Sequence, residues 1–177
     1  MRKLTHDELV SRQQRNKDAS KIPFFVVLNN IRSLYNVGSI LRTADGVGVE
    51  KIWLCGITGI PPDPKISKTA LGADKTVPWE YRENVRGLLE ELKFIGYQIV
   101  LLEQTERSIP YEEFVPRPPV CLVLGNEISG VVEDILPSCD VAVEIEMAGL
   151  KNSLNVSVAF GIVAYHIRNC LKVKSFW

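Results

Sequence analysis

The sequence predicts a single α/β domain with a mostly parallel sheet flanked by helices. Residues 22–28 (IPFFVVL) form a near-continuous apolar run rich in aromatic and β-branched residues, which is typical of a strand buried on both faces of a parallel sheet. Four further strand-like runs alternate with segments whose apolar residues recur at helical spacing. A chain of 177 residues with 46% hydrophobic and 24% charged residues has enough apolar surface for one such core. This composition excludes a disordered chain, a collagen-like fibre and a disulfide scaffold.

The individual elements follow from apolar periodicity and from proline and glycine punctuation. Residues 57–82 hold four of the ten prolines, so we expect a long loop there with one helical turn near residues 68–72. The prolines at 110, 116, 118 and 119 mark a second linker. The expected helices cover residues 4–20, 36–48, 84–96, 129–137 and 154–170, and the expected strands cover residues 22–28, 51–57, 97–103, 119–125 and 141–147.

The last of these helices carries apolar residues around nearly its whole circumference. They are Leu154, Val156, Val158, Ala159, Phe160, Ile162, Val163, Ala164 and Ile167. A helix of this kind is expected to be buried on all sides. In a domain this small, the sheet covers one face and a second subunit the other, so we expect a homodimer.

Charge is unevenly distributed although the net charge is zero. Residues 1–21 hold six Lys/Arg against three Asp/Glu, and residues 164–177 hold three Lys/Arg and no acid. We therefore divide the chain into a basic N-terminal helical arm (1–21), a main domain (22–170) and a basic C-terminal tail (171–177). The two basic ends are either phosphate-binding arms or solvated helix faces, and charge alone favours neither.

The four cysteines, Cys55, Cys121, Cys139 and Cys170, are scattered and form no metal-ligand pattern. We expect them to be structural thiols and expect no metal site. The N-terminus lacks the apolar segment of a secretory signal, and no apolar run is long enough to span a membrane. A cytoplasmic protein is expected.

Three segments contain more glycine and polar residues than a plain core needs. In the first, residues 29–48, Asn36 is expected at a helix N-cap with Arg42 six residues on; the alternative is a plain cap and a surface arginine. In the second, residues 122–130, a buried strand runs into Gly125 and Glu127. Glu127 is expected either to accept hydrogen bonds from a ligand or to be only a carboxylate in the first turn of a helix, where the helix dipole stabilises its negative charge.

The third segment, residues 145–161, joins the fifth strand to the final helix. Ser153 is a candidate helix cap, and Asn155 would then lie in the first turn of an otherwise apolar helix, where an unpaired amide is costly. Open parallel sheets bind ligands at the carboxyl ends of their strands, where all three segments begin. Glycine-rich nucleotide loops, zinc-protease and hydrolase signatures are absent. Because His6 and His166 fall outside the three segments, any proton transfer must use Glu, Ser, Arg or water.

Together these segments resemble the three signature motifs of the SpoU (TrmH) family of RNA ribose 2′-O-methyltransferases, within the SPOUT superfamily. The resemblance spans residues 22–168, and three motifs in the correct order are far more specific than one. The matched positions are Asn36, Gly38, Arg42, Thr43 and Ala44 in the first motif, Leu124, Gly125 and Glu127 in the second, and Ile145, Met147, Ser153, Leu154, Asn155, Val156 and Ser157 in the third.

The resemblance implies a fold that the residues alone do not predict, a C-terminal deep trefoil knot within a SPOUT methyltransferase domain. It also implies an S-adenosyl-L-methionine cofactor bound in the knot and a homodimer with the site at the subunit interface. The implied cofactor-binding residues are Leu102, Gly125, Ile145, Met147 and Leu154.

The implied catalytic residues are Asn36, Arg42, Glu127, Ser153 and Asn155. The family often casts its first-motif arginine as the base, but guanidinium groups stay protonated in proteins. We therefore expect Arg42 to bind the substrate phosphate, held by Glu127 or Asn36, while Ser153 and Asn155 orient the ribose. Positioning the hydroxyl in line could by itself supply several kcal/mol of the barrier.

The RNA substrate is expected to be tRNA rather than rRNA, because the chain is compact and lacks the extra substrate-binding domain of many relatives. The candidate RNA-binding residues are Arg12, Arg15, Arg168, Lys172 and Lys174. Two alternatives stay open: a SPOUT base methyltransferase, and a non-catalytic knotted RNA-binding or dimerisation module. The filled set of polar motif positions argues against both.

Overall fold

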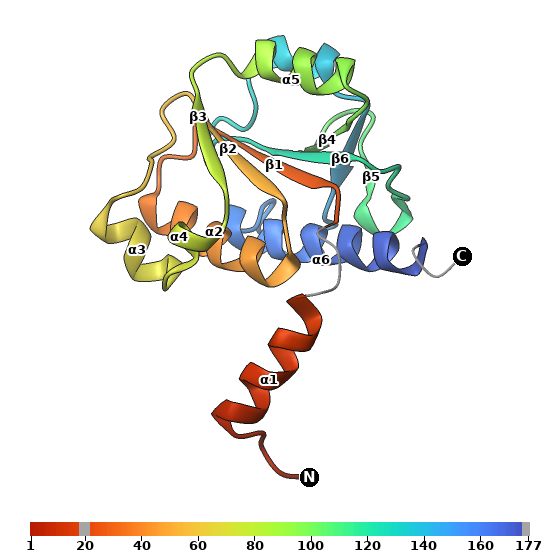
Figure 1. The fold of residues 1–177 in the computed structure, drawn as a ribbon. Coiled ribbons are helices and arrows are strands. Elements are labelled where there is room, and N and C mark those ends of the chain that lie inside the picture. Colours follow the sequence, from red (N-terminus) through yellow and green to blue (C-terminus); the bar gives the residue numbers. More distant parts are fainter. Residues whose placement is uncertain (18–21, 175–177) are drawn as a thin grey trace.

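The computed structural model describes residues 1–17 and 22–174. Within these ranges the fold is a parallel sheet in the order β3-β2-β1-β6-β4-β7-β5 (Figure 1). Every pairing of neighbouring strands is parallel, as the sequence predicts. The strands are β1 (Phe24–Asn29), β2 (Lys51–Cys55), β3 (Trp79–Arg82), β4 (Gln98–Leu102), β5 (Ile109–Pro110), β6 (Val120–Leu124) and β7 (Val141–Glu144).

Helices cover both faces of the sheet. Helices α2, α3, α4 and α6 lie on one face, and α5 with the short helix η2 lies on the other (Figure 1). The helices are α1 (His6–Lys17), α2 (Leu34–Val47), α3 (Pro64–Ala70), α4 (Ala73–Thr76), α5 (Val85–Phe94) and α6 (Val156–Lys174), and the 3-10 helices are η1 (Tyr111–Glu113) and η2 (Glu133–Ser138).

The central strand β1 shows why its sequence is almost continuously apolar. Phe24, Val26 and Leu28 point into the larger core beneath α2 and α6, whereas Val27 belongs to the second core beneath α5. All four side chains are fully buried. A strand with a helix layer on each side has no solvent-facing position, so the alternation of an exposed strand is missing.

Two helices begin at different residues from those expected. Helix α2 begins at Leu34, because the Ser33 hydroxyl caps it by accepting the backbone N–H of Asn36 at 3.3 Å. The predicted N-cap role of Asn36 is therefore wrong, and its side chain is free for other partners. Helix α6 begins at Val156 and continues to Lys174, four residues beyond its predicted end.

The segment 57–82 is more structured than a loop with one helical turn. It contains α3, α4 and the edge strand β3, whose sequence WEYR mixes aromatic with charged residues and has its two central residues exposed. Such a strand gives no apolar run from which to predict it, and its place is decided by pairing with β2. The predicted helix at residues 129–137 is the 3-10 helix η2, which begins only at Glu133.

The predicted burial of α6 on all sides does not hold within one chain. Its inner face is buried at Phe160, Val163 and Ile167, but Val158 and Tyr165 are 51% and 46% exposed. Contact of this outer face with a second subunit stays a prediction.

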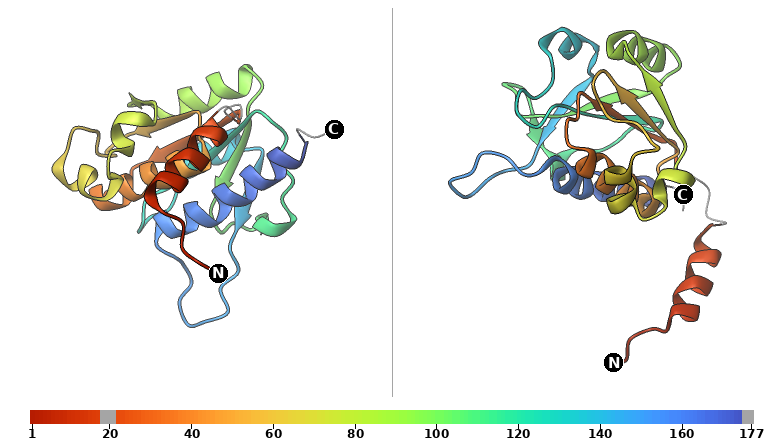
Figure 2. Two further views of the ribbon diagram at one scale, coloured as in Figure 1. Left: turned by 60° about the horizontal axis from the view of Figure 1, so that its bottom comes forward. Right: turned by 90° about the vertical axis from the view of Figure 1, so that its left-hand side faces the viewer.

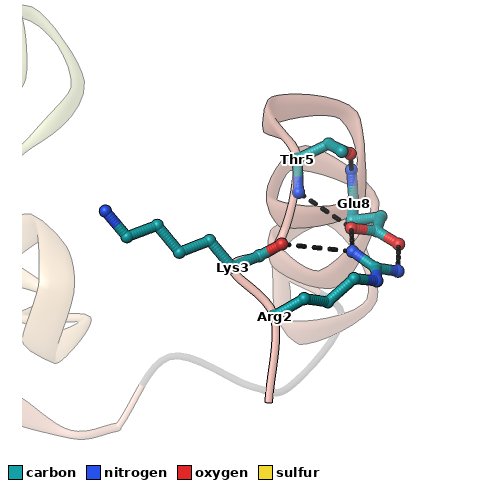
Figure 3. A network of polar contacts seen from close by, with 4 residues as sticks. All are labelled: Arg2, Lys3, Thr5 and Glu8. Carbon is teal, nitrogen blue, oxygen red and sulfur yellow. Dashed lines mark hydrogen bonds and ion pairs between the residues drawn. The ribbon is translucent and has the colours of Figure 1, made fainter.

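The N-terminal helix α1 extends away from the sheet (Figures 1 and 2). Its first turn is closed by a capping box, in which the Glu8 backbone N–H donates to the Thr5 hydroxyl and the Thr5 backbone N–H donates to Glu8 Oε2 (Figure 3). Arg2 pairs with both oxygens of the Glu8 carboxylate at 2.5 and 2.8 Å. These contacts, the guanidinium of Arg2 first, lower the pKa of Glu8 to about 2.

Candidate active site

The loops that follow β4, β6 and β7 meet at the carboxyl edge of the sheet and enclose a cavity of about 340 Å³, which we call the strand-end pocket. The segment between β7 and α6 projects from the body beside it (Figure 2). All five residues expected to bind the cofactor line this pocket: Leu102, Gly125, Ile145, Met147 and Leu154. The sheet thus brings together side chains that are up to 52 residues apart in the sequence.

The chemistry of the strand-end pocket is apolar and acidic. Leu124, Val156 and Ala159 extend its apolar wall. Three carboxylates, Glu103, Glu127 and Glu144, also line it, and no Lys or Arg does. A pocket of this kind suits a flat apolar group and a positive charge. Of these acids only Glu127 is predicted from the sequence, because Glu103 follows a strand without a motif and Glu144 directly precedes the third motif segment without belonging to it.

One hydrogen-bond network joins residues from all three motif segments. The Asn36 side-chain amide donates to Glu127 Oε1 at 2.9 Å, and the Asn155 amide donates to Asn36 Oδ1 at 3.1 Å. Asn155 Oδ1 in turn accepts the backbone N–H of Ser157 at 2.9 Å and its hydroxyl at 2.6 Å. Asn155, rather than the predicted Ser153, is therefore the N-cap of α6.

The carboxylate of Glu127 anchors this network. It also accepts the backbone N–H groups of Arg32 and Ser33 at 3.1 and 3.2 Å, which ties the loop after β6 to the loop after β1. Partial burial raises the pKa of Glu127, but the donors from Asn36, Arg32 and Ser33 together outweigh it, so the net pKa lies below its ordinary value. Glu127 is thus ionised at neutral pH and is a weak base.

An ionised Glu127 fixes the orientation of both amides. A carboxylate only accepts, so Asn36 must turn its NH₂ group to Glu127 and its oxygen to Asn155. Asn155 must then turn its NH₂ group to Asn36 and its oxygen to Ser157. Every hydrogen bond of this chain therefore donates in the same direction, from the first turn of α6 towards the Glu127 carboxylate.

Close backbone packing holds the loop after β6 in place. A Cβ on Gly125 would lie 2.5 Å from Val131 Cγ2 and 2.6 Å from the carbonyl carbon of Gly130, so no other residue fits without movement. Asn126 donates to the carbonyl of Asn30 at 2.8 Å, and its oxygen accepts two backbone N–H groups of its own loop. The predictions from the sequence do not include that Asn30 and Asn126 hold these loops together. Each asparagine follows a predicted buried strand, and this position is the sequence signal that could have indicated the role.

The remaining expected catalytic residues lie apart from this network. Ser153 is exposed and lines the strand-end pocket. Arg42 is exposed on α2 and lines a second hollow between α2, α3 and α6. Within residues 1–17 and 22–174, no hydrogen bond joins Arg42 to Glu127 or Asn36. Its predicted support by these two residues is not seen in the single chain, where both are bonded to other partners.

The candidate RNA-binding residues are found on α1 and α6. Arg12 and Lys172 are exposed. Arg168 donates to the carbonyl oxygens of Gly46 and Val47 and so caps the C-terminus of α2. Arg15 belongs to α1 and Lys174 to α6, and the structure does not describe the side chains of these two residues. RNA binding by these residues stays a prediction.

The cysteines are free, and two of them, Cys55 and Cys121, are buried. Burial raises the pKa of Cys55 to about 12 and that of Cys139 to about 11, so neither thiol is reactive at neutral pH. Among the described residues, no three His, Cys, Asp or Glu side chains are grouped so that they could hold a metal ion. None of the described helices has the length and hydropathy needed to cross a bilayer.

Comparison with known proteins agrees with this geometry. The profile of the SpoU rRNA Methylase family matches residues 23–165. The tRNA (guanosine(18)-2′-O)-methyltransferase of Aquifex aeolicus is 32% identical over 166 residues, which are 93% of this chain and 75% of the relative. The 23S rRNA (guanosine-2′-O-)-methyltransferase of Neisseria meningitidis is 33% identical over 159 residues, 90% of this chain and 63% of the relative. The chain spans only 60–61% of the length of several other curated relatives.

Solved structures share the fold. The TrmH/SpoU tRNA-modifying enzyme of A. aeolicus has a TM-score of 0.81 and 31% identity, covering 94% of this chain and 86% of that one. An rRNA methyltransferase from Sinorhizobium meliloti, solved with S-adenosylmethionine (AdoMet) bound, has a TM-score of 0.78 and 28% identity, covering 84% of this chain and 56% of that one. The predicted membership of the SpoU (TrmH) family is thereby confirmed, and the chain belongs to the SpoU methylase family.

Proposed function

We propose that this protein transfers a methyl group from S-adenosyl-L-methionine to a ribose 2′-hydroxyl of structured RNA, with tRNA as the preferred substrate. The observation that carries the proposal is the network of Asn36, Glu127 and Asn155 beside the strand-end pocket. Each motif contributes one of its members. The relatives named for tRNA and rRNA 2′-O-methylation support the reaction class.

The strand-end pocket fits the proposed cofactor in size and chemistry. Its volume of about 340 Å³ is in the range of small-molecule sites, roughly 300–1,000 Å³. Leu102, Ile145 and Leu154 offer an apolar wall for the adenine ring, and the acidic lining suits a sulfonium cation and ribose hydroxyls. When bound, the cofactor supplies an electrophilic methyl group.

The polar residues beside the pocket are proposed to position the attacking ribose hydroxyl and not to act as a strong base. Asn36 and Asn155 each have a second amide N–H that the network does not use, and the Ser153 hydroxyl lines the strand-end pocket. These groups are proposed to orient the ribose. Glu127, already ionised and holding three N–H donors, keeps the amides in one orientation. Arg42 is proposed to bind the substrate phosphate, a role that suits a planar guanidinium.

A homodimer is proposed on the outer face of α6. Val158 is half-exposed there, and Ile162, one turn further along the helix, is partly exposed on the same stripe. Because Arg42 lies outside the strand-end pocket of its own chain, a second subunit is a natural way to complete the site. Val158→Glu is expected to convert a dimer into monomers, as measured by sedimentation.

We also propose the deep trefoil knot expected of SPOUT proteins, with residues 22–170 as the methyltransferase domain. It is supported by the path of the chain, because α6 follows β7, which lies between β4 and the edge strand β5, and returns to pack against α2 and β6. The Gln104 side chain donates to the carbonyl of Asn152 at 2.8 Å, so the loops after β4 and before α6 are in contact. The basic arm (1–21) and tail (171–177) are proposed to help bind RNA.

The first test is calorimetric titration with S-adenosylmethionine. Wild-type protein is expected to bind about one cofactor per subunit, and Leu154→Arg to lose binding, because the added charge would enter the pocket wall. Leu150→Arg is the matched control: it lies on the same loop and is fully exposed outside the pocket. No binding by wild type, with or without RNA, would point to the non-catalytic module instead.

The second test identifies the methylated atom. The protein is incubated with unfractionated tRNA or rRNA and labelled cofactor, and the digested nucleosides are analysed by mass spectrometry. Label on ribose is expected, with more on tRNA than on rRNA. Label on a base would replace the proposal with the base methyltransferase alternative.

A further inference from the structure

The second hollow, which we call the α2–α3 hollow, has a volume of about 530 Å³ and lies between α2, α3 and α6. Its polar lining consists of Ser39, Arg42, Thr43, Lys68, Thr69 and Tyr165. Only Arg42 of these belongs to the expected catalytic set. Lys68 lies at the helical turn predicted within the long loop of residues 57–82, and the sequence predicts no role for it.

The charged residues that line this hollow are both positive. Arg42 and Lys68 are its charged residues, and no carboxylate lines it. The two acids on the flanking helices are bonded to other partners: Asp45 accepts the Thr76 hydroxyl at 3.0 Å, and Asp74 accepts the Ser67 hydroxyl at 2.9 Å. Within the described part of the chain, no hydrogen bond or ion pair occupies Arg42 or Lys68. Two free cations and several hydroxyls are what a phosphate group needs.

Close packing of α2 and α3 places the two cations on one hollow. A Cβ on Gly38 would lie 2.1 Å from Thr69 Oγ1 and 2.2 Å from the carbonyl oxygen of Ile66. The Thr69 hydroxyl also donates to the carbonyl of Tyr35 at 2.9 Å. The first-motif glycine therefore lets α3 dock directly on α2. This docking lets Lys68 of α3 and Arg42 of α2 line the same hollow.

We propose that the α2–α3 hollow binds a backbone phosphate of the RNA and that Lys68 is its second cation, beside Arg42. This inference rests on the proposed RNA methyl transfer and adds a residue and a subsite to it. Lys68 acts here as a point charge that holds a phosphate and so helps to fix the register of the RNA. It is a binding residue and does not contact the reacting atoms.

The test compares Lys68→Ala with Lys65→Ala by filter binding of unfractionated tRNA and of rRNA over a series of salt concentrations. Lys65 is an exposed lysine of the same helix that does not line the hollow, so both variants lose the same charge. Lys68→Ala is expected to weaken RNA binding about three- to tenfold and to reduce the salt slope by roughly 0.7–0.9, the value of one phosphate contact. Lys68→Arg should retain most of the affinity.

Cofactor titration separates this inference from the proposed function. Lys68→Ala is expected to bind S-adenosylmethionine like wild type and to raise the KM for RNA more than it lowers kcat. If Lys68→Ala matches Lys65→Ala in affinity and salt slope while wild type still methylates RNA, only the present inference is wrong. If wild type neither binds the cofactor nor methylates RNA, the proposed function fails and this inference with it.

A free anion is distinguished by titration with inorganic phosphate. The hollow is expected to show no saturable binding of inorganic phosphate under these conditions. Phosphate binding that is lost in Lys68→Ala, together with unchanged RNA binding, would assign the hollow to a small anion and overturn the proposal.

Discussion

The strand-end pocket and the α2–α3 hollow differ in charge and in how their polar side chains are held. The pocket is lined by three carboxylates and an apolar wall, whereas the hollow is lined by two cations and hydroxyl groups. At the pocket, Glu127 and its partners are bonded to one another, which fixes them before any ligand arrives. At the hollow, Arg42 and Lys68 are exposed.

This difference matches the two reactants of the proposed reaction. A sulfonium cofactor suits an acidic pocket, and a polyanionic RNA suits a basic hollow. Because the net charge of the chain is zero, the separation of acidic residues at the pocket from basic residues at the hollow is visible only in the structure. Four of the five predictions below change one of the two sites, and two of these four also test whether the other site is unaffected.

The largest effect is expected from Gly125→Ala at the pocket. The new Cβ would overlap Val131 and the Gly130 backbone, so residues 130–131 must move and cofactor binding should be lost. Gly149→Ala is the control, since nothing lies within 4 Å of a Cβ there. Calorimetry measures the cofactor affinity and filter binding the RNA affinity. Retained cofactor binding in Gly125→Ala would contradict the close packing seen at this position.

Glu127→Gln should have the next largest effect. An amide offers one accepting oxygen, so its NH₂ group would face at least one of the N–H donors from Asn36, Arg32 and Ser33. Misorientation of Asn36 is expected to lower methyl transfer about a hundredfold. The control is Glu133→Gln, an exposed acid on η2. An unchanged rate in Glu127→Gln would mean that the network is not needed for turnover.

Gly38→Ala is the matching change beneath the hollow. The Cβ would push α3 and its Thr69 away from α2, at a cost of about 1–3 kcal/mol in the free energy of unfolding. RNA affinity should fall several-fold, while cofactor affinity stays near that of wild type. Gly161→Ala, where the nearest atom is 3.8 Å away, should be well tolerated. Equal loss of cofactor and RNA binding in Gly38→Ala would show that the two sites are not independent.

Acid should weaken the pocket through Glu127. Its folded-state pKa lies below the ordinary 4.5, so its contribution to stability is present above pH 4.5 and is lost as the pH falls through the lower folded value. Urea unfolding at a series of pH values measures this. The acid-dependent loss should be smaller in Glu127→Gln than in wild type; identical pH profiles would exclude Glu127 as a source.

The smallest effect is expected in α1, which belongs to neither site. The pKa of Glu8 is about 2, so the capping box should persist at neutral pH and be lost as the pH falls from 4.5 through about 2. Thr5→Ala should reduce the helical circular-dichroism signal slightly at neutral pH and leave cofactor binding unchanged. A clear loss of cofactor binding in Thr5→Ala would connect the arm to the pocket.

The sequence by itself determined the parallel α/β architecture and most of the pocket wall. A strand such as 22–28 is apolar throughout because both its faces are covered, and this pattern is local. Likewise Gly125, Glu127 and the residues near Asn155 follow strand ends, where parallel sheets gather their loops. The cofactor-binding role of the wall residues Leu102, Ile145, Met147 and Leu154 is predicted through the family resemblance rather than through periodicity.

Only the tertiary structure decided which side chains are partners. Ser33 and Asn155 proved to be the helix caps, which freed Asn36 for Glu127, 91 residues away. The polar strand β3, the docking of α3 on Gly38 and the capping of α2 by Arg168 also arise from contacts distant in sequence. Hydrogen-bond partners and close backbone contacts depend on which loops the sheet brings together in space. A local pattern of residues does not contain the distances between segments that are far apart in the sequence.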